Sequence, residues 1–256
     1  MSEARAWHDL LPRVLSGVAM AAVGAVMIWL GGWPFTLLVC LVCGAMIWEA
    51  ARMFDLPQPL ADGALAGTAL LLAVVLPGLA TLPLLLASML VSASRAISAK
   101  GLYAATHFAI LLTCFGLVLW RDTAGFPGLL WLVAVVVASD VLGYFAGRMF
   151  GGPKFWPSIS PKKTWSGTVA GWVGAALVGL AFMPVSGLGP VVVLISVLLA
   201  FAGQMGDIAE SAIKRKRGVK DSSNLIPGHG GVLDRFDALM GASALTLLLL
   251  PFNFAA

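Results

Sequence analysis

The stretch VLSGVAMAAVGAVMIWLG, residues 14–31, runs for 18 residues without a charged side chain. A helix needs roughly 20 mostly apolar residues to cross the hydrocarbon of a bilayer, so this length suits a membrane span. No small-residue cleavage site follows the run, and we therefore interpret it as a retained span, not a signal peptide. The stretch decides the fold because the same pattern recurs along the chain.

Nine such apolar runs can be placed, with approximate limits 14–31, 34–51, 60–77, 79–95, 101–120, 127–147, 168–186, 189–211 and 234–252. The chain of 256 residues is 60% hydrophobic and 11% charged, with a mean hydropathy of +0.96, as in polytopic membrane proteins. Helices are required because lipid offers the backbone no hydrogen-bond partners. We predict an all-α integral membrane protein with about nine transmembrane helices and one catalytic domain over residues 1–256. Its N-terminal spans would occupy residues 14–120, and its catalytic spans and cytoplasmic loops residues 127–252.

The basic residues predict the orientation of these spans. With a cytoplasmic N-terminus, 15 of the 16 lysines and arginines fall on the cytoplasmic side, and only Arg121 falls outside. The net charge of +4 then belongs to the cytoplasmic face, where it suits anionic headgroups or phosphates.

Three cysteines, Cys40, Cys43 and Cys114, all lie in apolar runs, so no disulfide framework is implied. The Cys40-x-x-Cys43 spacing would fit a redox pair or half of a metal site. We favour the plainer interpretation, in which they are small apolar residues of a membrane helix.

Acidic residues within or beside the predicted spans give the strongest functional signal. A carboxylate at membrane depth costs several kcal/mol unless it is paired, hydrated or bound to a metal. Helical spacing places Asp207, Glu210, Ser211 and Lys214 on one face. The same spacing groups Asp234 with Asp237 and Gly241, and Asp140 with Tyr144 and Gly147. We expect these faces to line a polar active-site cavity on the cytoplasmic side.

Another interpretation of these acids stays open. They could form buried ion pairs, Asp207 with Lys214 or Asp237 with Arg235. Glu49 could belong to the same cavity, or it could reach the interface from the end of its span.

The polar residues suggest phosphate chemistry with a hard metal ion. Aspartates at helix ends offer oxygen ligands to Mg²⁺, and basic clusters neutralise phosphate charge. The sequence GHGG, residues 228–231, precedes a predicted helix start, where backbone N–H groups favour an anion. A Walker A sequence is absent, which excludes a P-loop. His229 could serve as a metal ligand, a phosphate donor or a loop-packing residue.

The stretch SAIKRKRGVKDSSNLIPGHGGVLDRFD, residues 211–237, resembles the signature of the phosphatidate cytidylyltransferases, also called CDP-diacylglycerol synthases. The stretch SPKKTW, residues 160–165, is similar to a second region of that family, although Ser166 stands where the family commonly has glutamate. The first 130 or so residues resemble it only in hydropathy. The fixed positions of the signature are met by Ser211, Lys214, Arg215, Lys220, Asp221, Pro227, His229, Gly230, Gly231, Asp234, Arg235 and Asp237.

The resemblance implies that CTP and phosphatidic acid give CDP-diacylglycerol and pyrophosphate, for phospholipid synthesis, with one or two Mg²⁺ ions. It implies metal ligation by Asp207 and Asp234, with Glu210 and Asp237 as further candidates. The residues that it implies for catalysis are Asp207, Asp234, Asp237, Lys214, Arg215, Lys220, His229 and Arg235. Those that it implies for substrate binding are Asp140, Lys162, Lys163, Ser211, Asp221, Gly230 and Gly231.

The expected setting is a bacterial inner membrane, with the N-terminus and the active site on the cytoplasmic side. Membrane lipids would be the surroundings, nucleic acid is not an expected partner, and a homodimer is left open. Two other functions are weighed against this one. An ion-coupled transporter would need charges at the centres of its spans. A CTP-dependent kinase of a lipid alcohol is disfavoured by the fully met signature.

Overall fold

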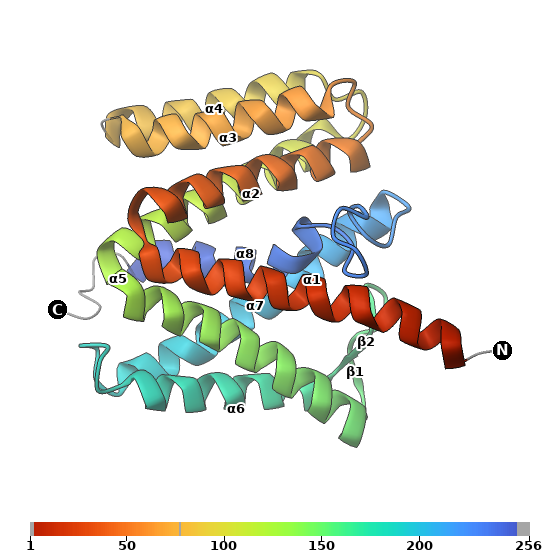
Figure 1. The fold of residues 1–256 in the computed structure, drawn as a ribbon, viewed down its shortest axis with the longest axis vertical. Helices are drawn as coiled ribbons and strands as arrows, with labels where there is room; N and C mark the ends of the chain where they lie inside the picture. Colours follow the sequence, from red (N-terminus) through yellow and green to blue (C-terminus); the bar gives the residue numbers. More distant parts are fainter. Residues whose placement is uncertain (1–2, 77, 250–256) are drawn as a thin grey trace. The chain divides into compact units, whose positions relative to one another are not determined.

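The computed structural model describes residues 3–76 and 78–249, with side chains from residue 14 onward. Pro77, at the end of the predicted span 60–77, and residues 250–252 of the last predicted span lie outside this part. Helices dominate the described residues (Figure 1). In chain order the elements are α1 (Glu3–Leu30), α2 (Gly32–Met53), α3 (Pro59–Val75), α4 (Gly78–Ser94), α5 (Lys100–Phe150), β1 (Lys154–Trp156), β2 (Ser160–Thr164), α6 (Trp165–Phe182), α7 (Val191–Lys216), α8 (Leu233–Thr246) and the 3₁₀ turn η1 (Leu247–Leu249).

The predicted helical fold is confirmed, and the helices are consistent with the membrane class predicted from composition. Among the described residues, four helices, α2, α5, α6 and α7, are long and apolar enough to cross a membrane. Helices α3 and α4 are apolar but only 17 residues long, as is the apolar segment Val14–Leu30 of α1. Helix α8 ends at Thr246, earlier than the predicted span, and continues as η1. The number of nine spans therefore stays a prediction.

Helix α5 is interrupted at Gly125. This glycine has φ 65° and ψ −167°, which is not helical, and Pro127 follows it. Glycine adopts positive φ without steric cost, and proline lacks the N–H that would continue the helical bonding. The predicted boundary between spans 101–120 and 127–147 falls at this break.

The chain divides into two compact units, and the first comprises residues 1–115 and 217–236. In this unit α3 packs against both α2 and α4 and runs antiparallel to each of them (Figure 1). A Cβ atom on Gly63 would lie only 2.5 Å from the carbonyl oxygen of Gly44. Glycines therefore let the backbones of α2 and α3 touch, which is how helices associate closely in lipid.

The second unit comprises residues 116–216 and 237–256, and within it α6 packs against α7. Helices α7 and α8 also meet through glycine, because a Cβ atom on Gly206 would lie 2.5 Å from the carbonyl oxygen of Asp237. A short antiparallel hairpin, β1–β2, precedes α6. The sequence did not predict this hairpin, since Pro157 and Pro161 argue against strands.

Candidate active site

In the second unit, a cavity of about 500 Å³ lies beside the charged residues Asp140 of α5, Lys162 and Lys163 of the hairpin, and Asp207 of α7. The sequence predicted all four as site residues. Glycines bring α5 close to the start of α6, directly after the hairpin, because a Cβ atom on Gly167 of α6 would lie 2.5 Å from the carbonyl oxygen of Gly143 on α5. With Arg148, which also lines it, the cavity combines two carboxylates with three basic side chains.

Lys163 is the partner of Asp207 in this cavity. Its Nζ atom lies 2.5 Å from Asp207 Oδ2, and it also donates to the backbone oxygen of Gln204 at 3.4 Å. Both side chains of the ion pair keep more than a fifth of their surface exposed, at 25% and 29%. An exposed pair of this kind contributes little to stability. Solvent therefore reaches both charged groups of this ion pair.

The hairpin explains how the two lysines reach the cavity. Strand β2 pairs with β1 through Thr164 and Lys154, and the backbone N–H of Trp165 donates to the carbonyl of Pro153 at 3.0 Å. The side chain of Thr164 then caps α6 by accepting from the N–H of Gly167 at 3.2 Å. Ser166, which stands at the family's glutamate position, donates to the carbonyl of Gly151 at 2.5 Å. Its hydroxyl therefore closes the turn after α5.

Gln204 is a cavity residue that sequence reasoning missed. Its Nε2 atom donates to Ser139 Oγ and to the carbonyl of Thr168, both at 3.3 Å, and its Oε1 accepts from Trp172 Nε1 at 3.0 Å. It therefore ties α5, α6 and α7 together beside the ion pair. The available signal was its spacing, since Gln204 lies three residues before Asp207 on α7.

The other predicted residues on α7 and α8 of this unit have local partners. Lys214 is buried and pairs with Glu210 at 2.5 Å, one helical turn earlier. Ser211 donates to Asp207 Oδ1 at 3.3 Å, and Asp237 Oδ1 accepts from the following N–H at 2.7 Å. Arg215 is exposed. The sequence left open an ion pair between Asp207 and Lys214, but in the structure Asp207 pairs with Lys163 and Lys214 pairs with Glu210.

In the first unit, the loop between α7 and α8 forms a second polar cavity of about 500 Å³, lined by Lys220, Asp221, Asn224, His229, Gly230 and Arg235. The turn is tight: the N–H of Ile226 donates to the carbonyl of Gly230 at 2.8 Å, and the His229 N–H to that of Ile226 at 2.9 Å. Gly230 has φ +82°, a conformation that favours glycine. Charged side chains and freely approachable backbone are features of anion sites.

His229 is held by α1. Its Nδ1 atom lies 2.8 Å from the hydroxyl of Ser16, which also donates to the carbonyl of Pro227 at 3.0 Å. Of the roles left open for His229, this contact supports loop packing and leaves the Nε2 atom without an assigned role.

Asp234 opens α8 and is buried, at 7% exposure. Its Oδ2 atom accepts from the N–H of Gly231 at 2.8 Å, and from the N–H and hydroxyl of Ser222 at 3.0 and 3.1 Å. Ser222 is a second residue that sequence reasoning missed. These hydrogen bonds compensate for burial of the carboxylate.

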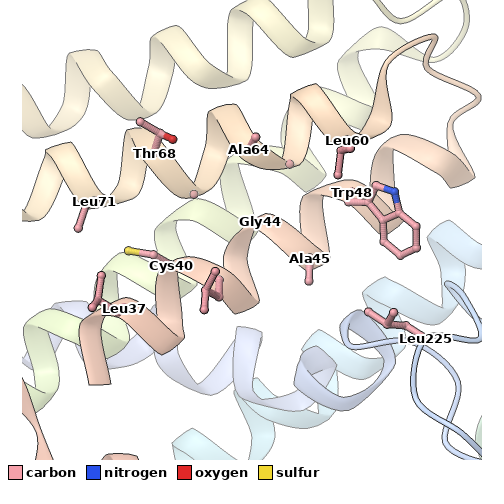
Figure 2. Close-up of a pocket in the computed structure, with 13 residues that line it drawn as sticks. Leu37, Cys40, Gly44, Ala45, Trp48, Leu60, Ala64, Thr68, Leu71 and Leu225 are labelled. Carbon is pink, nitrogen blue, oxygen red and sulfur yellow. The ribbon is translucent and has the colours of Figure 1, made fainter. Parts of the chain in front are cut away.

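The first unit also carries an apolar groove of about 700 Å³ between α2 and α3 (Figure 2). Its wall includes Cys40, Gly44 and Trp48, and Leu225 of the α7–α8 loop lies at one end. Cys40, Cys43 and Cys114 are all free and buried. The interpretation of the cysteines as apolar helix residues agrees with this burial.

Among the described residues, no three His, Cys, Asp or Glu side chains gather as a metal site. Mg²⁺ does not require such a set, since it usually binds one or two carboxylates together with water and substrate phosphates. Asp140 and Asp207, which line one cavity, provide carboxylate oxygens of the kind that Mg²⁺ prefers.

The chain has apolar helices long enough to cross a membrane and two cavities that each contain acidic and basic side chains. These features indicate a membrane enzyme suited to phosphate chemistry. The model of the cytidylyltransferase family matches residues 11–252, so the chain belongs to that family. A phosphatidate cytidylyltransferase of Brucella abortus is 35% identical over 253 residues, which are 94% of this chain and 93% of that protein. One of Bacillus subtilis is 32% identical over 255 residues, covering 91% and 94%. One of Helicobacter pylori is 44% identical over 128 residues, covering 49% and 48%.

Proposed function

We propose that this protein is a CTP:phosphatidate cytidylyltransferase, which makes CDP-diacylglycerol and pyrophosphate from CTP and phosphatidic acid. The observation that carries the proposal is the similarity over more than nine-tenths of the chain to relatives that bear this name. The expected signature and the second region, residues 160–165, both fall within the matched range.

The reaction asks for positioning and charge neutralisation. An oxygen of the lipid phosphate attacks the α-phosphorus of CTP, the new O–P bond forms, and the bond to the bridging oxygen breaks so that pyrophosphate leaves. Protein groups contribute mainly by aligning the two phosphates and stabilising their charge. Mg²⁺, when bound, would neutralise negative charge on the phosphate oxygens.

In the second unit, Lys162 and Lys163 are proposed to bind phosphate oxygens beside Asp140. Binding of phosphate by Lys163 would release Asp207 for the metal, because the two now share one ion pair. In the first unit, Lys220 and Arg235 are proposed to bind phosphate at the cavity of the α7–α8 loop.

Asp234 is proposed as a further Mg²⁺ ligand. Supporting or contact roles are proposed for Glu210, Asp237, Ser211, Lys214, Arg215, Asp221, His229, Gly230 and Gly231.

The proposed setting is the bacterial inner membrane, with the active site on the cytoplasmic side, where a soluble nucleotide can meet a lipid headgroup. Fifteen of the 16 basic residues support this orientation under the predicted topology. The homodimer left open from the sequence is not part of the proposal.

The test uses purified protein in detergent with phosphatidic acid and CTP labelled at either the α- or the γ-phosphate, with and without Mg²⁺. Lipid that carries the α-label supports the proposal. Lipid that carries the γ-label, with diacylglycerol or another lipid alcohol as acceptor, indicates a kinase. The Asp207→Asn variant is measured in the same assay, and its rate of α-label transfer should fall steeply compared with wild type.

A further inference from the structure

Glu49 on α2 is fully buried, at 0% exposure, although it lies near the helix end where a glutamate could reach the membrane surface. The sequence left two alternatives open for Glu49: it could belong to the polar cavity, or it could reach the membrane interface. In the structure its carboxylate lies against the segment that leads into α8, residues 222–233, which is in the same unit. A buried carboxylate requires several hydrogen bonds to be tolerated, and those of Glu49 all come from this segment.

Each oxygen of Glu49 accepts one backbone and one hydroxyl hydrogen bond. Oε1 accepts from the N–H of Val232 at 2.9 Å and from Ser223 Oγ at 2.6 Å. Oε2 accepts from the N–H of Leu233 at 2.7 Å and from Ser222 Oγ at 3.1 Å. Both backbone donors lie at the N-terminus of α8, where N–H groups have no partner within the helix and negative charge is favoured. Glu49 therefore caps a helix that is distant in sequence. Val232, which directly precedes this helix, has an apolar side chain that cannot accept a hydrogen bond from these N–H groups.

The same contacts lead directly to Asp234. The hydroxyl of Ser222 lies 3.1 Å from both Glu49 Oε2 and Asp234 Oδ2, and its N–H donates to Asp234. Gly231 fits between these groups only because it lacks a side chain, since a Cβ atom there would lie 2.6 Å from Glu49 Oε1. Glu49, Ser222, Gly231 and Asp234 thus form one hydrogen-bonded cluster.

We propose that Glu49 is a positioning residue, which holds the glycine-rich loop and the start of α8 so that Asp234 keeps its orientation for the reaction. This role rests on the proposed function, in which Asp234 acts at the phosphates. Glu49 itself acts through Ser222 and the N–H groups of Val232 and Leu233.

Glu49→Gln is the decisive variant because it keeps the size of the side chain and removes one acceptor. An amide NH₂ group cannot accept from a backbone N–H, so either Val232 or Leu233 loses its bond. Per molecule of folded protein, kcat should fall by about 10- to 100-fold, while KM for CTP changes by about threefold or less. Backbone amides of residues 225–236 should exchange with deuterium at least about tenfold faster, while α3 and α4 keep their protection.

Asp62→Asn supplies the matched control. Asp62 is also fully buried in this unit, but it bonds Ser92 and Arg95, far along the chain from the loop. Its replacement should destabilise the fold, leave kcat per folded molecule near the wild-type value and not alter exchange in residues 225–236. Ser222→Ala keeps Glu49 but removes the shared hydroxyl, and it should lower kcat by about tenfold.

The proposal is overturned if Glu49→Gln turns over within about twofold of wild type, or if its faster exchange spreads evenly through the unit as in a general core defect. Should Glu49→Gln not fold, a normal kcat in Ser222→Ala overturns it equally. Wild-type protein that transfers no α-label contradicts the proposed function instead. Exchange in the unliganded protein then still decides whether Glu49 holds the loop.

Discussion

Replacing Asp234 by asparagine separates the charge of this carboxylate from its hydrogen bonds. Oδ2 accepts from Gly231 N–H, Ser222 N–H and Ser222 Oγ, whereas Oδ1 shares only the Ser222 N–H, at 3.1 Å. An asparagine whose oxygen takes the place of Oδ2 keeps three of these four contacts. The lost contact is one limb of a shared hydrogen bond, so the free energy of unfolding should fall by about 1 kcal/mol or less.

Activity should fall much further than stability. If Asp234 stabilises the reacting phosphates through Mg²⁺, removal of its charge should lower kcat by about a hundredfold or more, which corresponds to about 2.7 kcal/mol of barrier. The rate is measured as α-label transfer to phosphatidic acid in detergent, and stability as thermal or denaturant unfolding of the same preparation. Normal turnover of Asp234→Asn, or a rate loss that only follows a loss of folded protein, would refute the reasoning.

Asp55→Asn is the control for this experiment. Its carboxylate is 83% exposed and pairs with Arg217 in the same unit. An exposed ion pair contributes little, so this variant should keep kcat within about twofold of wild type. An equal loss in both variants would indicate a general sensitivity of the unit to lost negative charge.

Three further changes test other parts of the account. Ser166→Ala should keep activity within about tenfold, roughly 1.4 kcal/mol of barrier, because the hydroxyl bonds Gly151; a larger loss in folded protein would give this hydroxyl an essential role. Gly241→Ala should lower the free energy of unfolding by about 1–3 kcal/mol or more, because its Cβ would overlap the Ala202 carbonyl. The control Gly24→Ala, with open space around it, should not lower it, and equal stability of the two variants would contradict the close packing of α7 and α8. Cysteines at the exposed Ser158 and Asn224 should react with an impermeant reagent only when the cytoplasmic side is opened, and labelling in intact cells would overturn the orientation.

Composition and hydropathy alone were sufficient for the helical membrane class. The reason is physical: in lipid every backbone group must find its partner within the segment, so a long apolar run has little choice but a helix. Even the break between two adjacent spans was predictable, because Gly125 and Pro127 both disfavour a continuous helix. The short hairpin β1–β2 was not, since it depends on pairing across a proline-containing turn.

The sequence also identified the candidate residues of the site, because a carboxylate or a basic cluster is costly in so apolar a chain unless it has a task. It did not identify their partners. The pairing of Asp207 with Lys163 and the burial of Glu49 against residues 222–233 join segments that are 44 to 184 positions apart. Hydropathy and spacing describe one helix at a time, whereas these contacts arise from how separate segments pack. The class of protein and its chemical groups were therefore determined by the sequence, and the function of Glu49 as a remote helix cap was decided only by the tertiary structure.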